Sequence, residues 1–204
     1  MSHGPLRIAL LAPMLILAVV PGASADFRVG ATGGPGAGHM SYGGEFDKIK
    51  WSGGVSLEFP VGQRIGLRSG VDWRPNGSQL ASGIPEYNST TLRFDYIALP
   101  LGARYQIYSN GRLKLLGLGA MEWSYLVNAH QTIDDMNSVE TGSDVTDQMQ
   151  SWDIAPVLGI AVATTGGFEL AVQHSWGLRN VYKNSNDLKN RSLWLLGTLW
   201  LDFP

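Results

Sequence analysis

Two long stretches near the middle of the chain alternate apolar residues with small or polar ones. They are Phe94–Tyr108 (FDYIALPLGARYQIY) and Arg112–Trp123 (RLKLLGLGAMEW), and Ser109-Asn110-Gly111 joins them. Because Asn-Gly tolerates the positive φ angles of a tight turn, the pattern predicts a β-hairpin. Each stretch is about as long as a bilayer-spanning strand, which has roughly 9–11 residues.

Each predicted strand has one face that is mainly apolar, because successive side chains of a strand point to opposite sides. The face opposite it is small or polar, as with Ala98, Gly102 and Arg104 in the first stretch. The apolar faces consist of Ile97, Leu99, Leu101, Ala103, Tyr105 and Ile107 in the first stretch, and of Leu113, Leu115, Gly117, Gly119, Met121, Trp123 and Tyr125 in the second.

The rest of the chain repeats this unit, and the connections alternate between long and short. Bacterial outer-membrane barrels have this layout, with long extracellular loops and short periplasmic turns. We therefore predict an all-β fold, an eight-stranded antiparallel up-and-down transmembrane β-barrel of the size of the small OmpA and OmpX barrels, with both ends on the periplasmic side. The other strands are expected at about 27–32, 50–59, 64–73, 151–163, 168–176 and 190–203, and the long loops at 33–49, 74–91, 128–150 and 177–189.

Aromatic residues lie at both ends of the predicted strands, as they do at the two interfaces of a membrane barrel. We expect them to form two girdles, one at the level of the lipid headgroups on each side. The loop-side girdle is Trp51, Trp73, Trp123, Trp152 and Trp176, and the turn-side girdle is Phe59, Tyr105, Tyr108, Phe168 and Phe203.

The face opposite the apolar one carries charges of both signs in near balance. An eight-stranded barrel is just wide enough for side chains to fill its interior, and buried charges require partners. We predict a buried ion-pair network that fills the lumen and argues against a wide diffusion pore. A proton or ion path through the network is the functional alternative. The residues are Arg28, Glu58, Arg68, Asp72, Arg104, Lys114, Glu122, Asp153 and Glu169.

The N-terminus has the features of a cleaved signal peptide. Arg7 precedes the apolar core Ile8–Val20, and Ala23–Ala25 is a small-x-small cleavage signal. We expect residues 1–25 to be removed and residues 26–204 to form the barrel domain. An uncleaved anchor is the alternative, although the core is short for a transmembrane helix.

Composition narrows the classes of protein further. The chain has 15 Lys and Arg against 17 Asp and Glu, a formal charge of −2, and no basic stripe that would suggest nucleic acid. It contains no cysteine, which excludes lipoprotein anchoring and disulfides. No stretch after the leader reaches the roughly 18 apolar residues of a transmembrane helix, so a chain that spans the membrane must do so as a closed barrel.

Residues Tyr96–Tyr105, YIALPLGARY, resemble the "Y-L-x-I-P-L-x-x-K-Y" strand of the outer-membrane β-barrel family typified by PorT-like proteins, common in Bacteroidetes. Ala98 departs from the Glu often found there, and Pro204 follows Phe203 where the family ends on an aromatic residue. The resemblance implies an outer-membrane barrel without a common substrate or reaction, and some members are linked to secretion. It extends to GVSLEFPVGQRIGLRSGV at 54–71, LLGLGAMEWSYLV at 115–127, VLGIAVATTGGFELAVQHSWGLRNV at 157–181 and KNRSLWLLGTLWL at 189–201.

The longest predicted loop, 128–150, contains the candidate chemistry of the chain. A Ser/His/Asp set for acyl transfer or proteolysis is present in composition, but catalysis requires positioned groups and nothing in the sequence fixes their geometry. The acids lack the D-x-[DN]-x-[DN]-G order of a calcium loop. We therefore expect a solvated acidic loop with no catalytic, metal or cofactor site. The residues concerned are His130, Asp134, Asp135, Ser138, Glu140, Ser143, Asp144 and Asp147.

Two further patterns carry no chemistry. The segment GATGGPGAG at 30–38 lacks the Gly-Lys-Ser/Thr ending of a phosphate-binding loop. The histidines His39, His130 and His174 lie far apart in sequence, and none forms a pair with metal-ligand spacing.

The sequence thus predicts a monomeric, non-enzymatic outer-membrane barrel that acts through its extracellular loops in envelope structure or macromolecular interaction. Its expected partners are outer-membrane lipid and a macromolecule at the loops. Three alternatives stay open: small-solute transport or a secretion accessory, an outer-membrane enzyme with a site in loop 128–150, and a soluble ligand-binding barrel with its apolar face inward.

Overall fold

The computed structural model describes residues 27–40, 45–46, 49–81, 87–135, 140–183 and 188–203. The predicted signal peptide, residues 1–25, lies outside the described residues. Within them the elements are β1 (Phe27–Met40), β2 (Glu45–Phe46), β3 (Lys50–Pro60), β4 (Ile65–Ala81), β5 (Tyr87–Ser109), β6 (Leu113–Asp135), β7 (Glu140–Asp144), the 3₁₀ helix η1 (Thr146–Gln148), β8 (Trp152–Thr164), β9 (Phe168–Asn180) and β10 (Lys189–Phe203).

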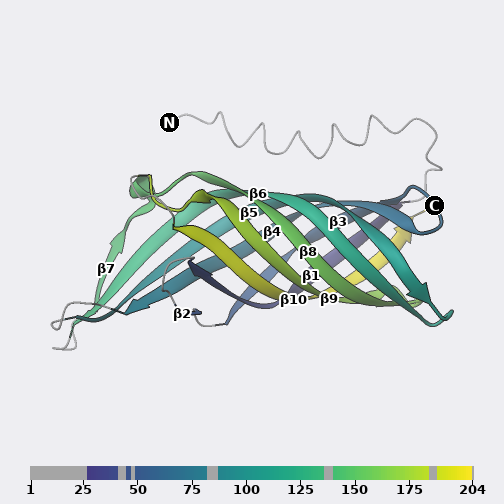
Figure 1. The fold of residues 1–204 in the computed structure, drawn as a ribbon, viewed down its shortest axis with the longest axis horizontal. Coiled ribbons are helices and arrows are strands. Elements are labelled where there is room, and N and C mark those ends of the chain that lie inside the picture. The colour runs from purple at the N-terminus through teal and green to yellow at the C-terminus, as the bar shows by residue number, and fades with distance from the viewer. Residues whose placement is uncertain are drawn as a thin grey trace.

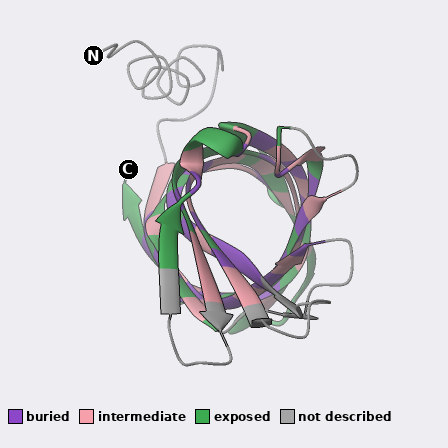
Figure 2. Ribbon diagram, turned by 90° about the vertical axis from the view of Figure 1, so that its left-hand side faces the viewer, coloured by how far each residue is buried: buried purple, intermediate pink, exposed green. Residues whose placement is uncertain are grey.

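Eight of these strands close into a ring (Figures 1 and 2). They pair antiparallel in the order β1-β3-β4-β5-β6-β8-β9-β10, and β10 returns to β1 with Phe27 opposite Phe203. The short strands β2 and β7 extend this ring at its loop end, where they pair with β4 and β6. The predicted eight-stranded antiparallel barrel is confirmed.

The turn between β5 and β6 forms as the Asn-Gly signal predicts. Gly111 has a φ of +83°, a left-handed conformation that a glycine adopts without steric cost. The side-chain oxygen of Asn110 accepts hydrogen bonds from the backbone N–H groups of Arg112 and Leu113, at 3.1 and 2.8 Å. The turn therefore satisfies its own backbone donors and fixes the register of the longest hairpin.

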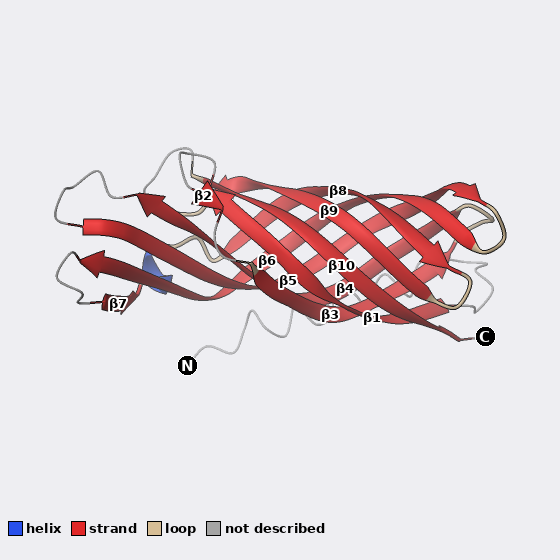
Figure 3. Cartoon of the chain, turned by 90° about the horizontal axis from the view of Figure 1, so that it is seen from below, coloured by secondary structure: helices blue, strands red, loops and turns tan. Residues whose placement is uncertain are grey.

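The strands run further toward the loop side than the sequence pattern predicts, and several predicted loop boundaries are wrong. β1 continues to Met40 instead of ending near Thr32, and β4 continues to Ala81 instead of ending at Trp73. β5 and β6 have 23 residues each. Figure 3 shows the loop-side strand ends, with β7 and the 3₁₀ helix beside them, projecting beyond the body of the barrel.

The polarity of the two faces of β5 exchanges at Tyr96, although the same alternate residues continue to point inward. This exchange explains why the loop-side extensions were not predicted. Below that point the apolar residues such as Leu101 point outward, whereas above it Leu92 and Phe94 are buried inside the barrel and Arg93 is exposed. We infer that the exchange marks the level where lipid gives way to water. The alternating pattern that predicts membrane strands requires apolar outward residues, so it stops at this level.

The two faces of the barrel wall have the polarity expected in a membrane. The outward side chains Leu158, Leu199 and Leu201 are 59, 62 and 65% exposed, whereas the inward Glu58 and Glu169 are completely buried. This arrangement is the reverse of the soluble ligand-binding barrel, which needs its apolar face inward, so that alternative is wrong. None of the helices in the described part of the chain is long and apolar enough to cross a membrane.

Candidate functional site

The lumen is the part of the molecule where charged side chains from different strands converge. In its turn-side half, Arg104 on β5 reaches Glu58 at 2.5 Å and Glu169 at 3.3 Å. Arg68 binds Glu169 at 2.7 Å, and Arg28 lies 3.7 Å from Glu58. The ion pairs therefore form one connected chain from β1 across the lumen to β9.

A layer of hydroxyl groups holds Arg68 from the other side. Thr32 shares hydrogen bonds with Ser56 at 3.1 Å and with Thr198 at 3.0 Å. The guanidinium of Arg68 donates to the same two hydroxyls and lies 5.0 Å from the ring of Trp200. Because the residues of this layer come from β1, β3 and β10, whereas Arg68 belongs to β4, three other strands hold the arginine in the lumen.

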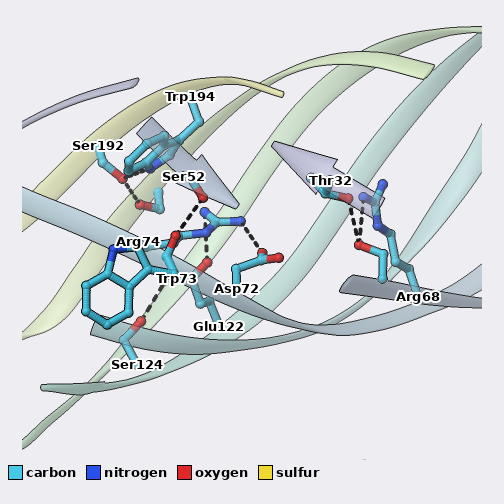
Figure 4. A network of polar contacts seen from close by, with 12 residues as sticks. Thr32, Ser52, Arg68, Asp72, Trp73, Arg74, Glu122, Ser124, Ser192 and Trp194 are labelled. Atoms are coloured by element: carbon cyan, nitrogen blue, oxygen red, sulfur yellow. Dashed lines mark hydrogen bonds and ion pairs between the residues drawn. The ribbon is translucent and has the colours of Figure 1, made fainter. Parts of the chain in front are cut away.

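Arg74 is the centre of the loop-side half of the network, and the sequence analysis placed it in a loop. Its guanidinium lies 3.0 Å from Asp72 and 2.9 Å from Glu122, with the ring of Trp194 at 5.8 Å (Figure 4). The residue is 5% exposed. The signal for it was available, since Arg74 continues the inward phase of Arg68 and Asp72 at a spacing of two.

A small residue on β5 makes room for this contact. In the strand ladders Arg74 lies opposite Tyr96 and Glu122 lies opposite Pro100, so the inward position between them on β5 is Ala98, whose side chain is a single methyl group. A long side chain at the buried Ala98 would project into the space that the guanidinium crosses.

Polar contacts continue above Arg74 toward the loop end. Asp153 accepts the backbone N–H groups of Ile154 and Arg179, at 2.8 and 3.0 Å. The Asn190 side chain donates to the buried hydroxyl of Tyr96 at 3.0 Å. Backbone N–H groups therefore hold the Asp153 carboxylate in the lumen, whereas the predicted ion-pair network gave it a charged side chain as partner.

An apolar cluster closes the lumen at the loop end. Its members come from the barrel wall and from the segment that follows β7, so this segment packs against the wall at the loop end. Val145 and Met149, from that connection, are 4 and 1% exposed. The buried members are Met40, Leu92, Phe94, Tyr96, Leu126, Ala129, Val145, Met149 and Val181.

Backbone hydrogen bonds hold this connection, residues 145–150, in place; we call it the strap. The N–H of Val145 donates to Ala129 at 3.0 Å, and the N–H of Gln150 donates to Val181 at 2.8 Å. The N–H of Lys183 donates to Gln148 at 3.1 Å. The expectation of a purely solvated acidic loop is therefore wrong for the strap, whose apolar residues were too few to form a recognisable sequence pattern.

The predicted girdle residues lie at two levels of the outer wall. Trp51, Trp73, Trp123 and Trp152 are between 41 and 71% exposed, at the loop-side level. Near the turn side, Phe27 stacks on Phe203 with ring centroids 5.2 Å apart and lies 6.1 Å from Phe59. The rings of Trp176 and His174 lie tilted against each other with their centroids 4.1 Å apart, which places that histidine on the outer wall. Tyr105, Tyr108 and Phe168 are also exposed there.

The space left in the lumen around Arg74 is small. Two cavities beside Arg74 have volumes of about 40 and about 30 Å³, enough for a few water molecules at most. A larger one of about 280 Å³ opens at the turn side, and Lys114 lines it together with Arg28 and Glu58.

The structure brings part of the candidate catalytic set together. His130 lies opposite Asp144 in the β6–β7 ladder, and its ring borders Gly142. Both His130 and Ser143 are exposed to solvent. The position of Ser138 lies outside the described residues. No group of three His, Cys, Asp or Glu side chains in the described ranges has the geometry to hold a metal ion.

Residues 21–183 match the profile of a family described as outer membrane protein beta-barrel domain. No curated protein matches the chain significantly. Among solved structures, it is similar to Ail, the attachment invasion locus protein of Yersinia pestis, with 12% identity over 87% of this chain and 98% of that one and a TM-score of 0.47. Neisserial surface protein A is similar with 14% identity over 88 and 99% and a TM-score of 0.47, and the outer membrane enzyme PagL with 8% identity over 86 and 99% and a TM-score of 0.41.

Proposed function

The chain belongs to the outer membrane β-barrel domain family, and on that premise we propose that it is a closed, non-enzymatic barrel that acts through its loop-side surface. The observation that carries this proposal is the blocked lumen. Ion pairs cross it through Arg104, the guanidinium of Arg74 lies over the ring of Trp194 from β10 at a second level, and the apolar cluster closes its loop end. A barrel with such an interior is better suited to presenting its loop-side surface and anchoring it in the membrane than to passing solutes.

The loop-side extension offers the surface for a partner. Above the exchange of polarity in β5 the outward face is polar, with Arg93, His130, Ser143 and Asp144 exposed. The extension stands on paired strands and on the strap, so its shape is held by backbone hydrogen bonds. We propose that it engages a macromolecule or another envelope component, while the outward apolar wall of a monomer contacts lipid.

Two finer assignments belong to this proposal. The strand YIALPLGARY, with Pro100 and Arg104 in the barrel wall, supports placing the chain in the PorT-like branch of the family. The segment Ile8–Val20 followed by Ala23–Ala25 supports export through a signal peptide cleaved after Ala25. Mass determination of the mature protein from the outer membrane tests the cleavage site.

Conductance measurements test the closed lumen. The full mature chain is reconstituted in planar bilayers beside a general porin that verifies incorporation. We expect no stable single-channel steps from this protein. Steps that change in size on Arg68→Ala or Glu122→Ala contradict the proposal and support transport through the lumen.

Lipid analysis tests the absence of catalysis. Outer-membrane lipids are incubated with the reconstituted protein and compared by mass spectrometry with lipids incubated with His130→Ala. We expect identical spectra. A product that forms with the native protein and is lost in the folded His130→Ala variant supports the enzyme alternative.

A further inference from the structure

The turn-side mouth of the barrel contains a cavity of about 280 Å³, which we call the vestibule. The β3–β4 turn, the β8–β9 turn and the ends of β1, β5, β6 and β10 surround it. Its inner boundary includes the ion pair of Glu58 with Arg104 and the buried side chain of Leu116. Since the apolar cluster closes the other end of the barrel, the vestibule is a pocket entered from the turn side.

The charges around the vestibule do not balance. Four cationic side chains line it, Arg28, Arg64, Arg104 and Lys114, against the two carboxylates of Glu58 and Asp202. The lining therefore carries a formal charge of +2.

The carboxylates are already engaged by two of the four cations. Arg28 binds Asp202 at 2.7 Å and lies 3.7 Å from Glu58, which Arg104 also binds. No ion pair within the described residues involves Arg64 or Lys114. These two side chains hold the surplus positive charge.

A concave site with charge of one sign and low-dielectric walls concentrates the electric field and attracts counter-ions. The membrane around the barrel supplies such walls. Neutral hydrogen-bonding side chains complete the lining: Gln63, Gln106, Thr164 and Thr165. From this arrangement we propose that the vestibule binds a small, doubly charged oxyanion, phosphate or a dicarboxylate, through Arg64 and Lys114.

The size of the vestibule sets the class of ligand. About 280 Å³ lies at the lower limit of small-molecule pockets. A phosphate, or a dicarboxylate of a few carbons, fits into this volume, whereas a folded partner does not. With the long loops outside the cell, the ligand comes from the periplasm. This site is therefore separate from the loop-side surface of the proposed function.

NMR titration of the full mature chain in lipid nanodiscs tests the proposal, with inorganic phosphate and succinate as separate probes. We expect saturable shifts of the amide signals of Gly66, Gln106 and Thr165 with at least one probe, and no shift at the strap. The probe that binds more tightly identifies the preferred oxyanion.

Charge-removing variants give the decisive comparison. Lys114→Gln and Arg64→Gln each remove one surplus charge without breaking an ion pair in the described residues, and each is expected to weaken binding about tenfold. Arg112→Gln, an exposed arginine at the same end that does not line the vestibule, serves as the control and keeps the native affinity. The absence of saturable shifts with both probes, or equal affinities in the native protein and both vestibule variants, overturns the proposal.

Discussion

The guanidinium of Arg74 on β4 lies 2.9 Å from a carboxylate oxygen of Glu122 on β6, although β5 separates these strands in the ring. Arg74 also binds Asp72 at 3.0 Å, so a single cation joins two buried carboxylates. Breaking such a group leaves uncompensated charge in a medium that solvates it poorly. The ion pair thus links β4 to β6 over the inner face of β5.

Replacing this cation is expected to destabilise the barrel strongly. Arg74→Met leaves the carboxylates of Asp72 and Glu122 buried without the cation that binds them, at a cost of about 3–5 kcal/mol in the free energy of unfolding. Urea unfolding in lipid vesicles, followed by the heat-dependent gel shift, measures the loss.

The control for this variant is Arg93→Met, which removes an exposed arginine of β5 and should change stability little. Adding Asp72→Asn and Glu122→Gln to Arg74→Met should restore part of the lost stability, because the buried charges are then removed together. Equal stability of Arg74→Met and the native chain would show that the pair contributes nothing.

The packing of β1 against β10 predicts a second effect. A Cβ atom on Gly36 would lie 2.1 Å from the ring of the buried Trp194. Gly36→Ala therefore forces that ring away from its place beside Arg74, and we expect a loss of about 1–3 kcal/mol. The same unfolding assay applies. Gly197→Ala is the matched control, because a Cβ atom at that position would lie 3.6 Å from its nearest neighbour, an ordinary contact distance.

The strap predicts a protease phenotype. Met149→Asp places a charge in the apolar cluster, and burial of an unpaired charge is costly, so the strap should detach while the barrel stays folded. Trypsin cleavage after the exposed Lys183 is expected to become at least about tenfold faster, which corresponds to about 1.4 kcal/mol of easier local opening. Gln148→Asp, at an exposed position of the same strap, should leave the rate unchanged.

The start of the strap is expected to respond to acid. Hydrogen bonds from the side chain and the backbone N–H of Thr146 lower the pKa of the Asp144 carboxyl, and the backbone bond is 2.9 Å long. Because the folded turn favours the charged carboxylate, this contribution is present above the usual pKa of Asp and is lost as the pH falls through the lowered value.

NMR titration of the Thr146 amide tests this response. We expect its midpoint below the ordinary pKa of an aspartate. Asp144→Asn should abolish the transition. A midpoint at or above the ordinary value contradicts the predicted role of Thr146.

The sequence by itself determined the barrel, the strands at membrane level and the side of the wall that each residue faces. Lipid favours an apolar side chain at each outward position, which is every second residue of a strand, and the short connections require turn residues such as Asn110 and Gly111. Both requirements are local, so they appear directly in the order of the residues.

The tertiary structure alone decided how far the strands rise above the membrane and what closes the lumen. Above Tyr96 water replaces lipid, the outward positions become polar, and the alternation that identifies a membrane strand reverses. The pairing of Arg74 with Glu122 and the burial of Met149 depend on contacts between segments far apart in the chain. Such contacts follow from the register of the paired strands and from the packing of the strap on the wall, and no short-range pattern in the sequence contains them.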